Sequence, residues 1–180
     1  MSGPRAAFLL RGVNVGGHRR VPMADLRAVA ESVGLEDART YVASGNLVAG
    51  CAGDVRDAAV RLAEALAECF GFAVDVIARD AGVWARYVAD APFPDVTAAN
   101  RVLLYVPRDP APAGALDGVS ARLGPGERAV ATADGVWVFH ADGAGRSKLT
   151  PAAIDASFGS PTTGRNLRTV AAIARLLQID

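Results

Sequence analysis

Residues 6–22, Ala-Ala-Phe-Leu-Leu-Arg-Gly-Val-Asn-Val-Gly-Gly-His-Arg-Arg-Val-Pro, place a glycine-rich turn between a strand and a helix. The apolar run 6–10 predicts a buried strand, and the apolar spacing after Pro22 predicts a helix that ends near residue 33. Gly12, Gly16 and Gly17 allow positive φ and bring backbone amides close to a ligand. The helix start adds unpaired amides and a partial positive charge, so this turn suits an anion.

This turn also has a purely structural interpretation, and its spacing excludes two known nucleotide-binding motifs. Its glycines can serve the backbone alone, with Arg19 and Arg20 on a solvated face. The spacing is not G-x-x-x-x-G-K-[ST], and it is not G-x-G-x-x-G with an acidic residue about 20 positions later. The sequence therefore predicts neither an ordinary P-loop nor a dinucleotide-binding turn.

The order of elements predicts the fold class. Strands are expected at 6–10, 39–43, 47–48 and 73–77, and helices at 22–33 and 54–70, the second with Asp54 as its N-cap and Gly71 at its end. Strand, helix, strand, strand, helix, strand is the order of a ferredoxin-like unit. The sequence therefore predicts an α+β protein whose first lobe, residues 1–79, is ferredoxin-like with an antiparallel sheet.

A similar order follows after a helix and linker at residues 80–100. Residues 102–106 predict a strand, 113–123 a helix, 129–132 and 136–140 a hairpin, and 149–158 a helix. Where a last strand is due, residues 160–166 predict a polar turn, followed by a helix with Val170, Ile173, Leu176 and Leu177 on one face. We expect a second ferredoxin-like lobe at 101–180, with the terminal helix.

Composition indicates a folded globular protein, because 51% of the 180 residues are hydrophobic and 21% are charged. The formal net charge is zero, with excess arginine in residues 1–46 and 146–180 and excess acid between them. This balance disfavours a wholly basic nucleic-acid binder and permits a local basic site. The chain has 18 arginines and a single lysine, Lys148. Either this lysine is present by chance, or it has a role that arginine cannot fill.

The chain lacks the signatures of membrane, metal and cofactor proteins. No run approaches about 18 apolar residues, and no export signal precedes residue 30, so we expect a cytoplasmic protein without a membrane partner. Cys51 and Cys69 fit neither a disulfide framework nor a metal site, and no His, Cys or carboxylate cluster has metal-ligand spacing. We expect no metal and no cofactor.

Three further polar turns carry the same kinds of group as the glycine-rich turn: Ser44-Gly45-Asn46, Arg146-Ser147-Lys148 and Thr162–Asn166. Arginine offers two parallel donors to phosphate or carboxylate, lysine a point charge, and hydroxyls and amides the remaining donors. We expect these turns to converge in space, although each taken singly is explained by capping or turn formation. The candidate ligand-binding residues are Arg11, Asn14, Gly16, Gly17, His18, Ser44, Asn46, Ser147, Lys148, Thr163, Arg165 and Asn166.

Candidates for catalysis are few. Only His18 and His140 are present, and no G-x-S-x-G elbow presents a serine. His140 ends a predicted strand, which favours a structural role, whereas Lys148 or His18 could act as general acid or base. Whether the protein is an enzyme is left open.

The strings Arg11–Gly17 (RGVNVGG), Ser44–Asn46 (SGN), Ser147–Leu149 (SKL) and Thr163–Val170 (TGRNLRTV) resemble, in this order, those of a bacterial family catalogued as domain of unknown function sixteen-ninety-seven. The resemblance covers nearly the whole chain and implies two ferredoxin-like lobes, but no reaction or ligand. The chain departs from the family where relatives usually have Lys or another polar residue at His18–Arg20 and Trp at Leu167.

Three functional hypotheses follow. The first is non-covalent binding of a phosphorylated ligand, either a nucleotide or a short nucleic-acid segment, at the basic, hydroxyl-rich turns. The second is a metal-independent enzyme on a phosphoester or acyl substrate, with Arg11 and Arg165 stabilising negative charge. The third is a protein-interaction module whose polar strings only cap helices and hold the lobes together. The sequence does not predict an oligomeric state.

Overall fold

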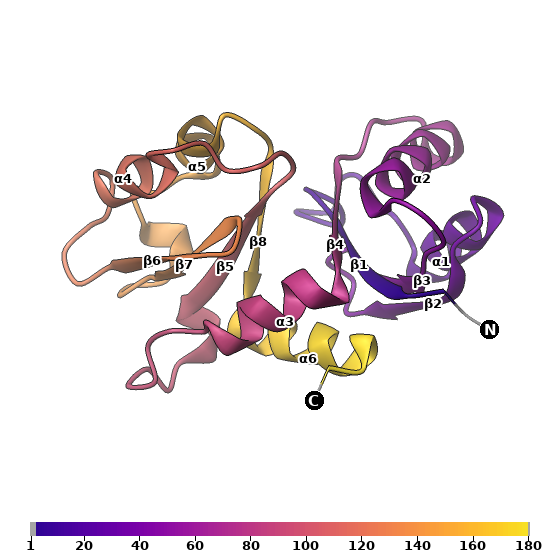
Figure 1. Ribbon diagram of the computed structural model, residues 1–180. Helices are drawn as coiled ribbons and strands as arrows, with labels where there is room; N and C mark the ends of the chain where they lie inside the picture. The colour runs from indigo at the N-terminus through magenta and orange to yellow at the C-terminus, as the bar shows by residue number, and fades with distance from the viewer. Residues whose placement is uncertain (1–2, 180) are drawn as a thin grey trace. The chain divides into compact units, whose positions relative to one another are not determined.

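Two four-stranded antiparallel sheets organise the chain in the computed structural model, which describes residues 3–179 (Figure 1). The chain divides into two units, one made of the described residues of Met1–Ala85 and Ala172–Asp180 and the other of Arg86–Ala171. The unit boundaries fall within α3 (Ala81–Ala89) and α6 (Leu167–Leu177).

The first unit contains β1 (Arg5–Leu10), α1 (Met23–Ser32), β2 (Glu36–Tyr41), β3 (Asn46–Gly50), α2 (Val55–Phe70) and β4 (Val76–Asp80). Its strands lie in the order β2-β3-β1-β4, and all pairs are antiparallel. This is the ferredoxin-like arrangement predicted from the element order.

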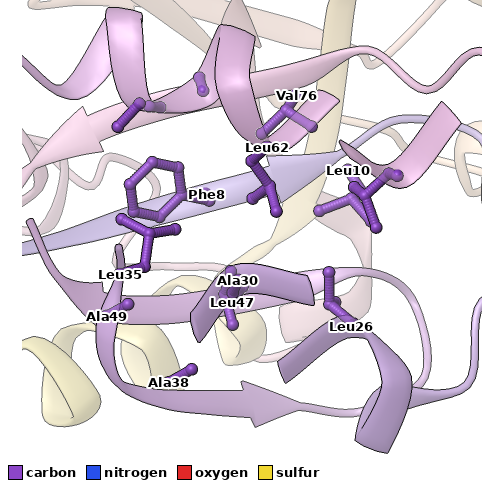
Figure 2. Close-up of a cluster of buried hydrophobic side chains, with 14 of the residues drawn as sticks. Phe8, Leu10, Leu26, Ala30, Leu35, Ala38, Leu47, Ala49, Leu62 and Val76 are labelled. Atoms are coloured by element: carbon purple, nitrogen blue, oxygen red, sulfur yellow. The ribbon is translucent and has the colours of Figure 1, made fainter. Parts of the chain in front are cut away.

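The core of the first unit lies between one face of the sheet and the helices α1 and α2 (Figure 2). Strand residues alternate between faces, so Phe8 and Leu10 of β1 point into this core with Leu47 of β3. Leu26 of α1 and Leu62 of α2 meet them from the helices, and all five side chains are buried. Burying each such side chain stabilises the fold by about 1.5–3 kcal/mol. The packed core therefore fixes the positions of the strands, and with them the positions of the turns that connect them.

Both ends of α2 form as the sequence predicts. The Asp54 side chain accepts hydrogen bonds from the N–H groups of Arg56 (2.8 Å) and Asp57 (3.0 Å), which satisfies two amides of the first turn. Gly71 ends the helix with a left-handed backbone at φ 77°.

The second unit contains β5 (Val102–Pro107), α4 (Ala115–Ser120), β6 (Arg128–Thr132), β7 (Gly135–Phe139), α5 (Pro151–Phe158) and β8 (Thr162–Asn166). Its strand order, β6-β7-β5-β8, repeats that of the first unit. Val136 and Val138 of β7 are buried with Val119 of α4 and with Ile154 and Phe158 of α5. The predicted α+β class with two ferredoxin-like lobes and a C-terminal helix is therefore confirmed.

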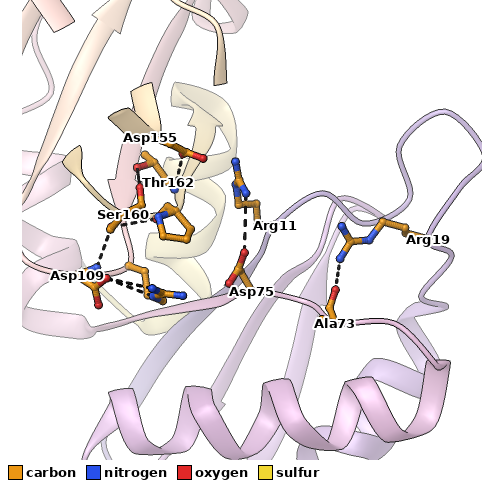
Figure 3. A network of polar contacts seen from close by, with 10 residues as sticks. Arg11, Arg19, Ala73, Asp75, Asp109, Asp155, Ser160 and Thr162 are labelled. Atoms are coloured by element: carbon orange, nitrogen blue, oxygen red, sulfur yellow. Dashed lines mark hydrogen bonds and ion pairs between the residues drawn. The ribbon is translucent and has the colours of Figure 1, made fainter. Parts of the chain in front are cut away.

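The predicted polar turn at 160–166 is wrong, because Thr162–Asn166 forms the strand β8, which pairs with β5 from Leu103↔Asn166 to Pro107↔Thr162. Two β-branched threonines favour a strand, and the edge of a sheet accepts polar side chains. The Thr162 hydroxyl donates to the Ser160 carbonyl (3.1 Å), and Asp155 accepts from the Thr162 N–H (2.9 Å; Figure 3). Hydrogen bonds from nearby side chains thus stabilise a strand whose sequence lacks the usual apolar pattern.

Several predicted boundaries are displaced by local backbone geometry. The second strand begins at Glu36, not at residue 39. A register shift between Glu36 and Arg39 allows Glu36 to pair with β3 as well. The fourth runs from Val76 to Asp80 instead of 73–77. The predicted helix at 113–123 is shortened to Ala115–Ser120, directly after Gly114 at φ 84°. The helix predicted at 149–158 begins at Pro151, with Thr150 as N-cap.

Three further observations concern the described residues. None of their helices combines the length and apolar character that crossing a bilayer requires. No group of three or more His, Cys, Asp or Glu side chains among them could hold a metal ion. Cys51 is buried and Cys69 exposed, and both are free thiols.

Candidate functional site

The glycine-rich turn of the first unit forms a small hairpin after β1. The Asn14 N–H donates to the Arg19 carbonyl (3.1 Å), and the His18 N–H donates to the Val15 carbonyl (3.1 Å). Gly12, Gly16 and Gly17 have φ of 65°, 60° and 78°, so the predicted left-handed conformations are confirmed. His18 and both tip glycines are exposed.

Asn14 holds this hairpin to its surroundings. Its side-chain oxygen accepts from the Val21 N–H (2.8 Å), and its Nδ2 donates to the carbonyls of Val21 (2.9 Å) and Ala43 (2.6 Å). Three hydrogen bonds use most of what an asparagine amide offers. Asn14 therefore acts as a structural tie between two turns.

The turn around Gly45 lies against the glycine-rich turn, as the sequence analysis expected for this pair. The Leu10 N–H donates to the Gly45 carbonyl (2.8 Å), and a Cβ added at Gly45 would lie 2.7 Å from the Leu10 Cβ. The Asn46 Nδ2 donates to the Tyr41 carbonyl and to the Ser44 hydroxyl, both at 3.0 Å. Ser44 and Asn46 thus shape this turn.

Arginines of the glycine-rich turn have partners within the first unit (Figure 3). The Arg11 Nη1 lies 3.8 Å from the Asp75 Oδ2. The Arg19 guanidinium lies over the Phe72 ring, 5.2 Å from its centroid, and donates to the Ala73 carbonyl. These contacts direct both guanidinium groups towards the segment that leads into β4.

In the second unit, Thr163, Arg165 and Asn166 lie on β8 instead of in a turn. Arg165 is buried, and its Nη1 donates to the Thr163 hydroxyl (2.7 Å) and the Gly164 carbonyl (2.8 Å). Burial lowers the pKa of Arg165 to about 10. The Asn166 side chain accepts from the Thr169 N–H (2.9 Å) and so caps α6.

A cavity of about 110 Å³ brings together the remaining predicted residues, Ser147 and Lys148. It lies where the loop after β7 passes the turn that precedes β6. The lining residues are Gly124, Pro125, Glu127, Ala141, Asp142, Gly143, Arg146, Ser147 and Lys148. Arg146 and Lys148 are exposed, and among residues 3–179 neither forms an ion pair with an acid. Exposure of Lys148 to solvent weighs against its predicted role as a general acid or base.

A buried chain of hydrogen bonds lies behind this cavity. The Glu127 Oε1 lies 2.8 Å from the His140 Nδ1, and the His140 Nε2 lies 2.9 Å from the Tyr105 hydroxyl. In the neutral imidazole the carboxylate accepts from Nδ1–H, so Nε2 accepts from the Tyr105 O–H. His140 is fully buried between two partners, which agrees with its predicted structural role.

Glu127 is anchored by two donors besides His140. The Gly124 N–H donates to its Oε2 (2.7 Å), and the Ser147 side chain also bonds to this carboxylate. Burial alone raises the pKa of Glu127, but the hydrogen bonds from Gly124, His140 and Ser147 outweigh burial and leave this pKa below its ordinary value. Burial, followed by the charge of Glu127, raises the pKa of Tyr105. Glu127 is therefore a fixed negative charge on the cavity wall.

Sequence reasoning missed Glu127 and Tyr105. No local pattern marks either residue, because their partners come from other strands: Tyr105 lies on β5, Glu127 precedes β6, and His140 follows β7. Only the strand pairing of the second sheet places the three side chains in a row.

Comparison with known proteins identifies the family and the fold. Residues 4–137 match the family described as "Protein of unknown function (DUF1697)", so the chain belongs to this family. Among solved structures, the chain is similar to the conserved bacterial protein SP0830 from Streptococcus pneumoniae, with a TM-score of 0.77 and 21% identity over 97% of this chain and 98% of that chain. At this identity the likeness shows the fold alone. The chain has no match among curated proteins.

Proposed function

We propose that this member of the DUF1697 family binds a small phosphorylated molecule in the cavity of the second unit, with the phosphate held by Arg146 and Lys148. The observation that carries the proposal is the pair of cations on the cavity wall, Arg146 and Lys148, which have no acidic ion-pair partner among the described residues. Charge-assisted donors of this kind are what phosphate oxygens require.

The size of the cavity narrows the class of ligand. A volume of about 110 Å³ corresponds to roughly four water molecules at about 30 Å³ each. Pockets that enclose drug-sized molecules span about 300–1,000 Å³. The enclosed part of the cavity is therefore the size of a phosphate group with a short substituent, and a larger ligand would extend beyond it.

The glycine-rich turn of the first unit is a weaker candidate for the phosphate site than the cavity of the second unit. Asn14 holds this turn to the turn around Gly45, where Ser44 and Asn46 bond to each other, and Arg11 and Arg19 contact Asp75 and Ala73. The third hypothesis, in which polar strings cap helices and hold the lobes together, also gives these residues a structural role, although this tie joins two turns of one unit. The expected cytoplasmic location stays a prediction.

Isothermal titration with short phosphomonoesters tests the proposal. Because each lost charge-assisted contact weakens binding, we expect Arg146→Ala and Lys148→Ala each to raise the dissociation constant about tenfold. The matched control is Arg122→Ala, which removes an exposed arginine of the same unit that does not line the cavity. Unchanged affinity in both cavity variants, or equal losses in the control, would exclude this site.

A further inference from the structure

The cavity of the second unit carries charges of both signs. Arg146 and Lys148 line it together with the carboxylates of Glu127 and Asp142. Within the part of the chain that the structure describes, neither cation forms an ion pair with either acid, and Glu127 accepts a hydrogen bond from His140. Two positive and two negative side chains thus border a single small space without neutralising each other.

This arrangement limits what can fill the space. A bare phosphate attracted by Arg146 and Lys148 would also face two carboxylates, and like charges repel each other. A ligand that carries a positive group close to its phosphate meets both sets of charges favourably. The electrostatics of the cavity thus favour a zwitterion over a simple anion.

Glu127 has the geometry of a recognition group for such a cation. Its side chain is only 6% exposed and is oriented by three donors, from Gly124, His140 and Ser147. A carboxylate offers about four acceptor positions, so three donors leave room for one more. Because the carboxylate is already fixed, a ligand N–H that reaches it orders no further side chain on the protein.

We infer that the ligand is a phosphorylated primary amine with a short linker, whose phosphate is held by Arg146 and Lys148 and whose ammonium group is held by Glu127 and Asp142. This inference rests on the proposed function and specifies the ligand class.

Two nearly isosteric probes test this inference on the unaltered protein. Phosphoethanolamine carries the ammonium, and propyl phosphate replaces it with a methyl group. We expect phosphoethanolamine to bind at least about tenfold more tightly, since one charge-assisted hydrogen bond and the attraction of two carboxylates are added. Equal affinity for the two probes would overturn the amine assignment and leave phosphate binding intact, whereas no binding of either probe would overturn both.

Two variants locate the effect. Asp142→Asn, at an exposed position, and Glu127→Gln, whose wild-type side chain is largely shielded from solvent, are each expected to reduce the preference for phosphoethanolamine while retaining affinity for propyl phosphate. The ratio of the two affinities is the readout, so a general loss of fold, which would affect both probes, does not imitate it. If neither variant changes the ratio, the ammonium binds elsewhere and the inference fails. Ethanolamine alone is the control for binding through the amine without phosphate.

Discussion

At the scale of single residues, Glu127 links the fold of the second unit to its cavity. It accepts hydrogen bonds from His140, Gly124 and Ser147, so one carboxylate joins the residue that follows β7, the turn before β6 and the loop that carries Lys148. A buried carboxylate is stable only with such partners. The same contacts that hold the loop in place therefore hold a negative charge at the cavity wall.

The lowered pKa of Glu127 predicts how stability depends on pH. A carboxyl whose folded pKa lies below its unfolded value, about 4.3, adds stability above that value and loses it as the pH falls through the folded pKa. We expect the unfolding free energy of the wild type to fall more steeply below about pH 4.3 than that of Glu127→Gln. Urea unfolding of both proteins from pH 7 downwards measures this difference.

Asp37, Asp54 and Asp95 also have lowered pKa values and contribute to acid unfolding in both proteins. The quantity of interest is therefore the gap between wild type and Glu127→Gln, which should shrink as the pH falls. A gap that stays constant over this range would show that the Glu127 charge adds no stability.

At the scale of elements, two turns of the first unit depend on each other. Gly45 has φ of 80°, and a Cβ there would lie 2.7 Å from the Leu10 Cβ and 2.8 Å from the Val13 Cγ2. Gly16 has φ of 60° but no heavy atom within 4 Å of an added Cβ. Substitution of Gly16 therefore tests backbone strain alone, whereas substitution of Gly45 tests backbone strain together with close packing.

This contrast gives a stability prediction. Gly16→Ala should destabilise the protein by about 1–2 kcal/mol, because a left-handed backbone is unfavourable for alanine. Gly45→Ala should destabilise the protein by the same backbone cost and by roughly 1–3 kcal/mol more, because the added Cβ overlaps with Leu10 and Val13. Chemical unfolding of both variants measures the two values. Equal losses would mean that the turns do not pack as described.

Elements with regular patterns could be predicted from the sequence, and those held by distant partners could not. The helix α2 was predicted with both its ends because Asp54 and Gly71 act locally. The strand β8 was missed because its stability comes from pairing with β5 and from side-chain bonds to Ser160 and Asp155. Lys148 and Ser147 could be proposed as site residues from residue type, but Glu127 could not, since His140 and Ser147 lie far from it in the sequence.

At the scale of the whole molecule, one chain builds the same strand order twice, and the predicted site residues divide between the two units. Arg11, Asn14 and the first two turns belong to the first unit, while Ser147, Lys148 and β8 belong to the second. The repeated architecture thus supports different local chemistry: a tied pair of turns in one unit and a charged cavity in the other.

This division predicts where a ligand protects the chain. On addition of phosphoethanolamine, the amides of residues 142–150 should exchange with solvent more slowly, because ligand binding suppresses the local opening of the loop around the cavity. The exposed turn at residues 15–18 in the first unit serves as an internal control and should not change. Hydrogen exchange read by mass spectrometry measures both segments. Slower exchange at residues 15–18 alone would place the ligand at the glycine-rich turn.

A crystal structure of the protein grown with phosphoethanolamine at saturating concentration tests the central claim most directly. The account predicts that the phosphate lies within hydrogen-bond distance of Arg146 and Lys148, with the ammonium group beside Glu127. Phosphoethanolamine bound on any other surface, or a cavity left without it, would contradict the account.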